Sequence, residues 1–167
     1  LIRASGEIAA DDEIIIIGSQ AILGQFPDAP VRLLSSMEAD VYPKNHPEKA
    51  DEVDDAIGEG SSFHELHGYY AQGVGKKTAV LPVDWERRLV AVSNENTNGV
   101  TGYCLEVHDL AISKLIAMRP KDLEFVQELV RHDMIDKKTM LRRLKQTDLE
   151  GSIRRVAQAR LKSFFKS

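Results

Sequence analysis

The strongest constraint on the fold is an uninterrupted run of four isoleucines, Ile14 to Ile17, which ends at Gly18. β-branched side chains favour strands, and a short run without polar residues that stops at a glycine is typical of a buried strand. Ser19 follows the glycine and is a suitable N-cap for a short helix over residues 20–25. The sequence therefore predicts a buried strand that turns directly into a helix.

Two carboxylates, Glu38 and Asp40, lie on the next predicted strand, residues 38–42. Alternate residues of a strand point to the same face, so the two groups are expected to lie side by side. Like charges at that distance repel each other unless a cation lies between them. Mg²⁺ commonly binds one or two carboxylates together with substrate phosphates. The pair predicts a magnesium site, and an ordinary strand edge with both acids in water is the alternative.

The remaining pattern predicts an α/β (α+β) protein, with a small mixed sheet followed by helices. Residues 1–107 are expected to form the core, and residues 108–167 a helical region that completes and extends the site. The further predicted strands are residues 78–81, 89–92 and 102–107. The further predicted helices are residues 47–57, 108–118 and 122–131, and two more with Asp136 and Asp148 as N-caps.

Composition limits the class of protein. The chain has 167 residues, 43% hydrophobic and 29% charged, which suits one domain. No apolar run approaches the roughly 20 residues that span a bilayer, so no membrane association is expected. Cys104 is the only cysteine, which fits a reducing cytoplasm. The first residue is Leu1, which indicates that the native start is missing, so a signal peptide is excluded only for the residues printed.

Charge is distributed unevenly. The net charge of −4 argues against a broadly basic surface that binds nucleic acid. Acids are concentrated in residues 38–65, whereas residues 137–167 are basic. A basic tail of this kind is usually a solvated helical face. The more specific hypothesis is that this tail is a docking surface for RNA or another polyanion.

Lys114 lies in a predicted helix that is apolar on nearly every side, so the helix is expected to be buried. A lysine there must reach solvent, pair with an acid or line a polar cavity. Asp109 and Ser113 indicate a narrow polar face on the same helix. Asp122 opens the next helix, close enough to pair with Lys114. An ion pair that joins two helices and a functional cation therefore both stay open.

Two weaker motifs do not indicate a function on their own. Gly18-Ser19 lies where backbone N–H groups can hold phosphate oxygens, although its spacing matches neither the Rossmann nor the P-loop motif. His64 and His67 flank Glu65 without the H-E-x-x-H spacing, and with His46 they are expected to be surface residues instead of a zinc site. Cys104 is expected to be a buried, inert thiol.

Together these elements resemble a known family. A strand that ends in Gly-Ser, a helix, and then S-x-[DE]-x-[DE] on a second strand resemble the nucleotidyltransferase fold of the DNA polymerase β superfamily. The later segments 109–115 and 121–126 are similar to the branch that contains the abortive-infection and toxin–antitoxin nucleotidyltransferases and many uncharacterised bacterial relatives. The resemblance covers roughly residues 13–131.

The resemblance implies a role for each motif. Gly18 and Ser19 would contact the nucleotide phosphates, and Glu38 and Asp40 would hold Mg²⁺ as cofactor. Lys114 would bind the triphosphate and Asp122 would assist as a further carboxylate. The implied reaction transfers a nucleotidyl group from an NTP to an RNA or protein acceptor, in a toxin–antitoxin setting with an antitoxin as partner.

Two departures from the family pattern keep rival functions open. Glu38 stands where the family more often has Asp, and its longer side chain moves the ligand oxygen. A third carboxylate on a later strand has no clear counterpart, and Asp84 and Glu106 are unsupported candidates. The first rival is therefore an inactive module of the same fold that binds a nucleotide or a partner. The second is an assembly protein whose basic last helix pairs with another chain.

Overall fold

A computed structural model describes residues 1–166. Over this range the chain forms a five-stranded mixed sheet, in the order β3-β2-β1-β5-β4, and eight α-helices. The predicted α/β class is thus confirmed. The strands are β1 (Glu13–Ile16), β2 (Glu38–Pro43), β3 (Tyr70–Gly73), β4 (Val90–Val92) and β5 (Thr101–Cys104). The helices are α1 (Ile2–Ala9), α2 (Ile22–Gln25), α3 (Ala50–Ile57), α4 (Ser62–His67), α5 (Val107–Ala117), α6 (Pro120–Arg131), α7 (Lys137–Lys145) and α8 (Gly151–Phe164).

The isoleucine run forms the middle of the sheet. β1 pairs with β2 in the antiparallel sense and with β5 in the parallel sense, so that Ile16 lies between Val41 and Cys104. Ile14 to Ile17 are each at most 4% exposed. A central strand that is covered on both faces needs apolar side chains at every position, and this explains the uninterrupted run.

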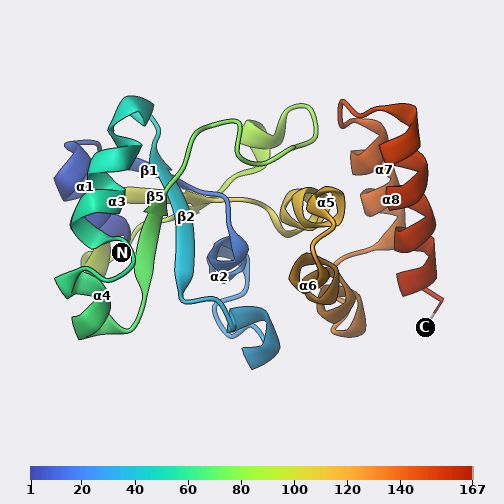
Figure 1. Cartoon of the computed structure of the whole chain (residues 1–167), viewed down its shortest axis with the longest axis horizontal. Coiled ribbons are helices and arrows are strands. Elements are labelled where there is room, and N and C mark those ends of the chain that lie inside the picture. Colours follow the sequence, from blue (N-terminus) through green and yellow to red (C-terminus); the bar gives the residue numbers. More distant parts are fainter. Residues whose placement is uncertain (167) are drawn as a thin grey trace.

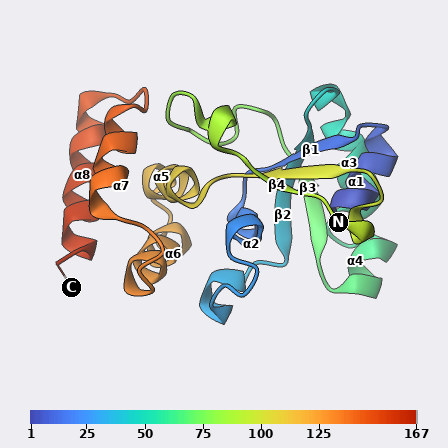
Figure 2. The ribbon, with the colours of Figure 1, turned by 180° about the vertical axis from the view of Figure 1, so that it is seen from behind.

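The helices lie on two sides of the sheet. In Figure 1, α1, α3 and α4 are grouped at one end of the long axis, next to the strands, and α7 and α8 at the other, with α5 and α6 between the sheet and these last helices. The view from behind in Figure 2 shows the same order reversed, and the two termini lie at opposite ends. Residues 1–106 therefore provide the sheet and the helices beside it, and residues 107–166 face it with a helical layer.

One hydrophobic core runs through both parts. α5 contributes Leu110, Ile112 and Leu115, all fully buried, and Met140 of α7 and Leu161 of α8 belong to the same cluster. The division into residues 1–107 and 108–167 remains a prediction. What the packing shows is that the last helices are part of the core.

Buried charge also ties α5 to its neighbours. Asp109 is fully buried instead of lying on an open polar face. Its carboxylate accepts from Arg88 Nε at 2.7 Å and lies 3.4 Å from Arg143 Nε on α7. Burial raises the pKa of Asp109, and the two guanidinium groups oppose that shift. Arg143 is one of the basic residues of the tail, so at least one of these charges holds the fold together.

Most predicted elements after residue 84 are present with small shifts. Asp136 is the N-cap of α7, and its carboxylate accepts from Thr139 N–H at 2.8 Å. The last helix, however, begins at Gly151 with Glu150 as N-cap, so the predicted cap at Asp148 is wrong. Ser19 is also not a cap, because Gly18 precedes a short 3₁₀ turn, η1 (Ser19–Ala21), which leads into α2.

One predicted strand is wrong. Residues 78–81 form a loop, and β3 and β4 are the edges of the sheet. The four residues are bounded by Gly75 and Pro82 and pair with neither edge strand. This loop instead lines a cavity beside Asp40. The glycine-rich section before it, which gave no sequence prediction, forms α4 and β3.

Candidate active site

A cleft of about 720 Å³ lies between the start of β2, the 3₁₀ turn η2 (Val31–Leu34) and helices α5 and α6. The structure brings five of the six predicted site residues to its lining. Those residues are Ser19, Glu38, Asp40, Lys114 and Asp122. A smaller cavity of about 260 Å³ adjoins it and contains Gly18, the sixth. Asp40 and Lys114 line both cavities, so they stand at the junction of the two.

The two acids lie on one face of β2, as expected from their spacing. Burial raises the pKa of Asp40 to about 6, and hydrogen bonding with Glu38 and its negative charge add to the increase. The charges of Lys114 and Arg119 act in the opposite direction. Two carboxylates this close repel each other, and a divalent cation bound by both would relieve that repulsion. The donor set of Glu38 and Asp40 therefore fits Mg²⁺, which is satisfied by two carboxylates and substrate oxygens.

Gly18 permits the close approach of β1 and β2 at this point. The N–H of Ile17 donates to the carbonyl oxygen of Asp40 at 3.0 Å. A Cβ atom at Gly18 would lie only 2.1 Å from Oδ2 of Asp40. The backbone φ of Gly18 is −86°, which any residue adopts, so glycine is needed for space and not for backbone freedom. Its role is thus to leave room for the Asp40 carboxylate.

Two cations face the acids from α5 and the corner before α6. Lys114 Nζ lies 3.1 Å from Oδ1 of Asp122, and Arg119 Nε donates to Oδ2 of Asp122 at 2.6 Å. Burial alone would raise the pKa of Asp122, but the hydrogen bond from Arg119 and the charge of Lys114 outweigh it, and the pKa is lowered. The pKa of Arg119 is raised, chiefly by its hydrogen bond to Asp122 and further by the charges of Asp40 and Glu38.

Asp122 therefore lies under the two cations as their shared partner. Its side chain is 1% exposed, whereas that of Lys114 is 10% exposed and that of Arg119 is 58% exposed. The ion pair that the sequence left open is present, and the same Lys114 also lines the cleft opposite Asp40. The two interpretations of Lys114 are compatible. The implied catalytic role of Asp122 stays a prediction.

Arg119 was missed by the sequence analysis, although a signal was available. It is the N-cap residue of α6, directly before Pro120, and a helix that begins with proline fixes the residue before it in an extended conformation. A long cationic side chain at such a corner, three residues before a buried acid, could have been identified as its partner.

Tyr70 was also missed, and no local pattern pointed to it. Its hydroxyl donates to Oε2 of Glu38 at 3.2 Å, and the ring of His64 lies 4.7 Å from the Tyr70 ring. β2 and β3 are parallel, and Glu38 is paired with Tyr70 in the register. The contact depends on strand pairing across a glycine-rich section, which the sequence alone did not resolve.

The candidates for a third carboxylate are engaged elsewhere. Glu106 caps α5 through His108 N–H at 3.2 Å and contacts His108 Nδ1 at 2.6 Å. Asp84 is exposed and lies 3.9 Å from Arg87. Within residues 1–166, no group of three or more His, Cys, Asp or Glu side chains is placed to hold a metal ion. Neither Glu106 nor Asp84 therefore joins Glu38 and Asp40, and the other carboxylates that line the cleft are those of Asp122, Glu124 and Glu128.

Comparison with known protein families gives a match over nearly the whole chain. A family model described as "Nucleotidyltransferase of unknown function (DUF6036)" matches residues 3–164. No curated protein and no solved structure matches the chain. In the part of the chain described here, no helix is long and apolar enough to cross a membrane. The match covers nearly the whole sequence, both acids, and the helices that carry Lys114 and Asp122. The chain therefore belongs to this nucleotidyltransferase family.

Proposed function

We propose that the protein transfers a nucleotidyl group from an NTP to an RNA or protein acceptor in a Mg²⁺-dependent reaction, as the toxic component of a toxin–antitoxin pair. One observation carries the proposal. Asp40 and Glu38 lie on one wall of the cleft, and Lys114 and Arg119 lie on the opposite side, close enough to shift the pKa of Asp40. A site with paired acids and paired cations suits a polyphosphate that is bound together with a divalent metal.

Each side chain then has a separate task. Lys114 and Arg119 bind the triphosphate, and Asp122 holds both cations in position. Glu38 and Asp40 hold Mg²⁺, which, when bound, neutralises charge on the phosphates and orients the displacement. The Tyr70 hydroxyl fixes one oxygen of Glu38, and the space left by Gly18 lets Asp40 stay in place. An acceptor hydroxyl loses its proton to solvent and forms the new bond to the α-phosphorus, while the bond from that phosphorus to the bridging oxygen breaks and pyrophosphate departs.

Calorimetric titration with each NTP, with and without Mg²⁺, tests the nucleotide site. NTP binding should require Mg²⁺. In Asp40→Asn, NTP binding should no longer depend on Mg²⁺. The melting temperature should stay the same, because the substitution removes a charge with little change in volume. Equal binding with and without the metal in the unaltered protein would contradict the role given to Glu38 and Asp40.

The acceptor is proposed to dock on α7. The exposed side chains of Lys137, Lys138, Arg142 and Lys145 line a surface groove of about 510 Å³. α7 packs against α5, and α5 carries Lys114 of the cleft, so one helix lies between the groove and the cleft. Polyanion binding of this kind weakens steeply with salt.

Deleting α7 and α8 would not test this docking, because Met140 and Leu161 are part of the core. The better variant changes all four groove cations to Gln and leaves the buried side unaltered. Incubation with labelled NTP, Mg²⁺ and a cell lysate should label an acceptor, and the variant should label it less while its NTP affinity is unchanged. A matched control changes Lys76, Lys77, Arg155 and Lys162, four exposed cations elsewhere, to Gln. Equal labelling by both variants would show that α7 does not bind the acceptor.

Digestion of the labelled product separates the acceptor classes. Label that is lost on ribonuclease treatment identifies RNA, and label lost on protease treatment identifies protein. Expression in a bacterial host tests the toxic role: growth should stop with the unaltered chain and continue with Asp40→Asn. Growth that is equal in both cases would contradict the toxin proposal and leave nucleotidyl transfer intact.

The second candidate is a binding module of the same fold that holds a nucleotide without chemistry. The position of Glu106 as a helix cap favours it, since Glu106 is then not available as a third carboxylate beside Glu38 and Asp40. Metal-dependent NTP binding with no pyrophosphate release in the presence of lysate would favour this candidate over the enzyme.

A further inference from the structure

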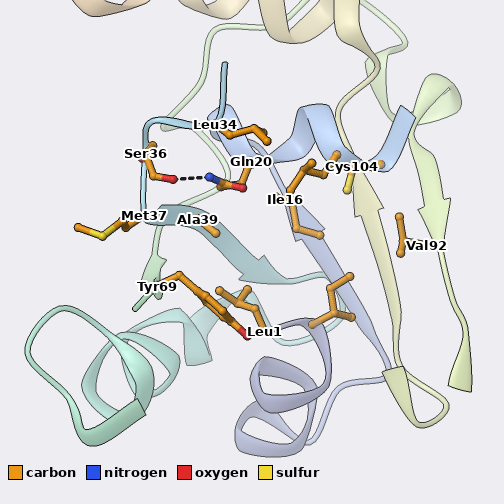
Figure 3. A pocket seen from close by; sticks show the side chains of 13 residues that line it. Leu1, Ile16, Gln20, Leu34, Ser36, Met37, Ala39, Tyr69, Val92 and Cys104 are labelled. Carbon is orange, nitrogen blue, oxygen red and sulfur yellow. Dashed lines mark hydrogen bonds between the residues drawn. The ribbon is translucent and has the colours of Figure 1, made fainter. Parts of the chain in front are cut away.

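A second large cavity lies on the face of β2 opposite the acids. Its volume is about 470 Å³. Ala39, between Glu38 and Asp40 in the sequence, is in its wall, together with Ile16 of β1 and Cys104 of β5. Figure 3 shows these residues from close by. This volume is within the range of about 300–1,000 Å³ that is usual for small-molecule sites.

The chemistry of the wall is uniform. The side chains that line it include no carboxylate, ammonium, guanidinium or imidazole. Six of the 13 lining residues have branched aliphatic side chains, namely Leu1, Ile2, Ile16, Leu23, Leu34 and Val92. Tyr69 supplies the one aromatic ring, and Met37 and Cys104 supply polarisable sulfur atoms. Burial raises the pKa of the Cys104 thiol to about 11, so that the thiol is neutral at physiological pH.

Exposed apolar residues gather where the cavity opens. Met37 is 57% exposed, Tyr69 is 41% exposed and Leu23 is 36% exposed, and all three line the cavity. Large apolar side chains that are exposed singly need no explanation, but a group around one hollow marks a binding surface. In Figure 3, Tyr69 lies beneath Ala39 beside Leu1, and Met37 extends away from the wall.

Polar groups occur on one side of the cavity. The side-chain amide of Gln20 donates to the carbonyl oxygen of Ser36, a contact that Figure 3 draws as a dashed line. Cys104 and Val92 lie away from this pair, toward the other side of the picture. A ligand that fits would therefore have an apolar body and one hydrogen-bonding end.

We infer that this cavity binds the uncharged aliphatic chain of a small amphiphile, whose polar end lies beside Gln20 and Ser36. Aliphatic walls with a single ring favour a flexible chain over a flat aromatic molecule. The polar side chains at that end, the Gln20 amide and the Ser36 hydroxyl, are uncharged, which favours a neutral end such as a hydroxyl or amide over a carboxylate. This inference is independent of the proposed nucleotidyl transfer.

The methionines supply a direct measurement. The chain has four, and of these Met37 alone lines the cavity, whereas Met118, Met134 and Met140 lie elsewhere. The protein labelled with ¹³C at the methionine methyl groups is titrated with 1-hexanol, 1-octanol and 1-decanol, and with decanoate as the charged comparison. The Met37 signal should shift to saturation while the other three stay in place. The affinity should increase roughly fourfold per added CH₂ group, and decanoate should bind more weakly than 1-decanol.

A charge at the mouth tests the location. Leu23→Glu should weaken 1-octanol binding at least tenfold, because the chain would then pass a carboxylate. Leu66→Glu is the matched control, since Leu66 is 79% exposed on α4 and does not line the cavity. If Leu23→Glu lowers the melting temperature, the unaltered protein supplies the second measurement. In that protein, 1-octanol should slow the reaction of Cys104, the only cysteine, with N-ethylmaleimide.

Three results would overturn the inference. The first is that the alkanols shift all four methionine signals or none. The second is that the affinity does not depend on chain length. The third is that the Met37 signal depends on protein concentration while sedimentation shows a dimer that Leu23→Glu dissociates. In that last case a second copy of the chain occupies the cavity.

Discussion

Lys114 and Asp122 form an ion pair across the corner between α5 and α6, with Nζ 3.1 Å from Oδ1. The other carboxylate oxygen is held by Arg119 at 2.6 Å. One buried acid thus positions two cations at the edge of the cleft. Because Asp122 keeps Arg119 when Lys114 is removed, the structural and the functional contributions of Lys114 can be measured separately.

Lys114→Met should weaken NTP binding at least tenfold, since a hydrogen bond to a charged group contributes about 1.5–3 kcal/mol. The free energy of unfolding should fall by less than about 3 kcal/mol, because Arg119 still neutralises Asp122. Calorimetric titration and denaturant unfolding measure the two quantities. Lys162→Met, on the exposed side of α8, is the control and should leave both unchanged. A destabilised Lys114 variant with normal NTP affinity would show that the lysine only joins the helices.

Asp122→Asn should lower the free energy of unfolding by about 3 kcal/mol at pH 7, because it leaves the buried Lys114 without its acid. The pKa of Asp122 is lowered in the folded protein, so its contribution is fully present above the unfolded value, about 3.9, and is lost as the pH falls through the folded value. The difference in the free energy of unfolding between the unaltered protein and the variant should therefore become smaller below about pH 4.

Urea unfolding from pH 7 to pH 3 measures this difference. Asp84→Asn is the control, since Asp84 is exposed and 3.9 Å from Arg87, and it should change stability by less than about 1 kcal/mol. If the difference in unfolding free energy for Asp122→Asn stays constant down to pH 3, the carboxylate is not held by the two cations.

Gly18→Ala should displace the Asp40 carboxylate, because the added Cβ would lie 2.1 Å from Oδ2. Mg²⁺-dependent NTP binding should be lost, and the free energy of unfolding should fall by about 1–3 kcal/mol. Gly75→Ala is the matched control, since nothing lies within 4 Å of its added Cβ. Normal metal-dependent binding by the Gly18 variant would show that Asp40 can move without consequence.

Tyr70→Phe removes the hydroxyl that donates to Glu38 and leaves the ring against His64. The Mg²⁺ concentration for half-maximal NTP binding should increase by a few fold, while stability changes by about 1 kcal/mol or less. Tyr69→Phe tests the adjacent residue, which lines the apolar cavity instead. If Tyr70→Phe changes stability but not the Mg²⁺ requirement, the hydroxyl has no part in holding Glu38 for the metal.

The sequence predicted those parts of the site that depend on local order. Glu38 and Asp40 share a face because any strand places alternate residues together. Lys114 and Asp122 were recognised as neighbours because only a short corner separates their helices. Tyr70 was not predicted, since its contact with Glu38 is created by strand pairing across residues 58–75, and the turns in that section leave no regular pattern.

The same distinction explains the errors in the fold. Residues 78–81 have strand-like composition, but β-propensity depends on context, and the chain leads these residues to the cavity beside Asp40 instead of along an edge strand. Asp109 was expected on a polar face because the sequence does not show that Arg88 and Arg143 converge on it from other elements. Local periodicity does not predict that a charged residue is buried when its partners come from distant parts of the chain.

The order in which the site residues occur along the chain has a consequence for biosynthesis. β1 and β2 emerge from the ribosome with Glu38 and Asp40 long before Lys114, Arg119 and Asp122 are made. A nascent chain, or a fragment clipped before α5, therefore carries the acids without the groups that would hold a triphosphate. Under the proposed function the site is complete only after α6 has docked, so an unfinished chain is expected to be inert.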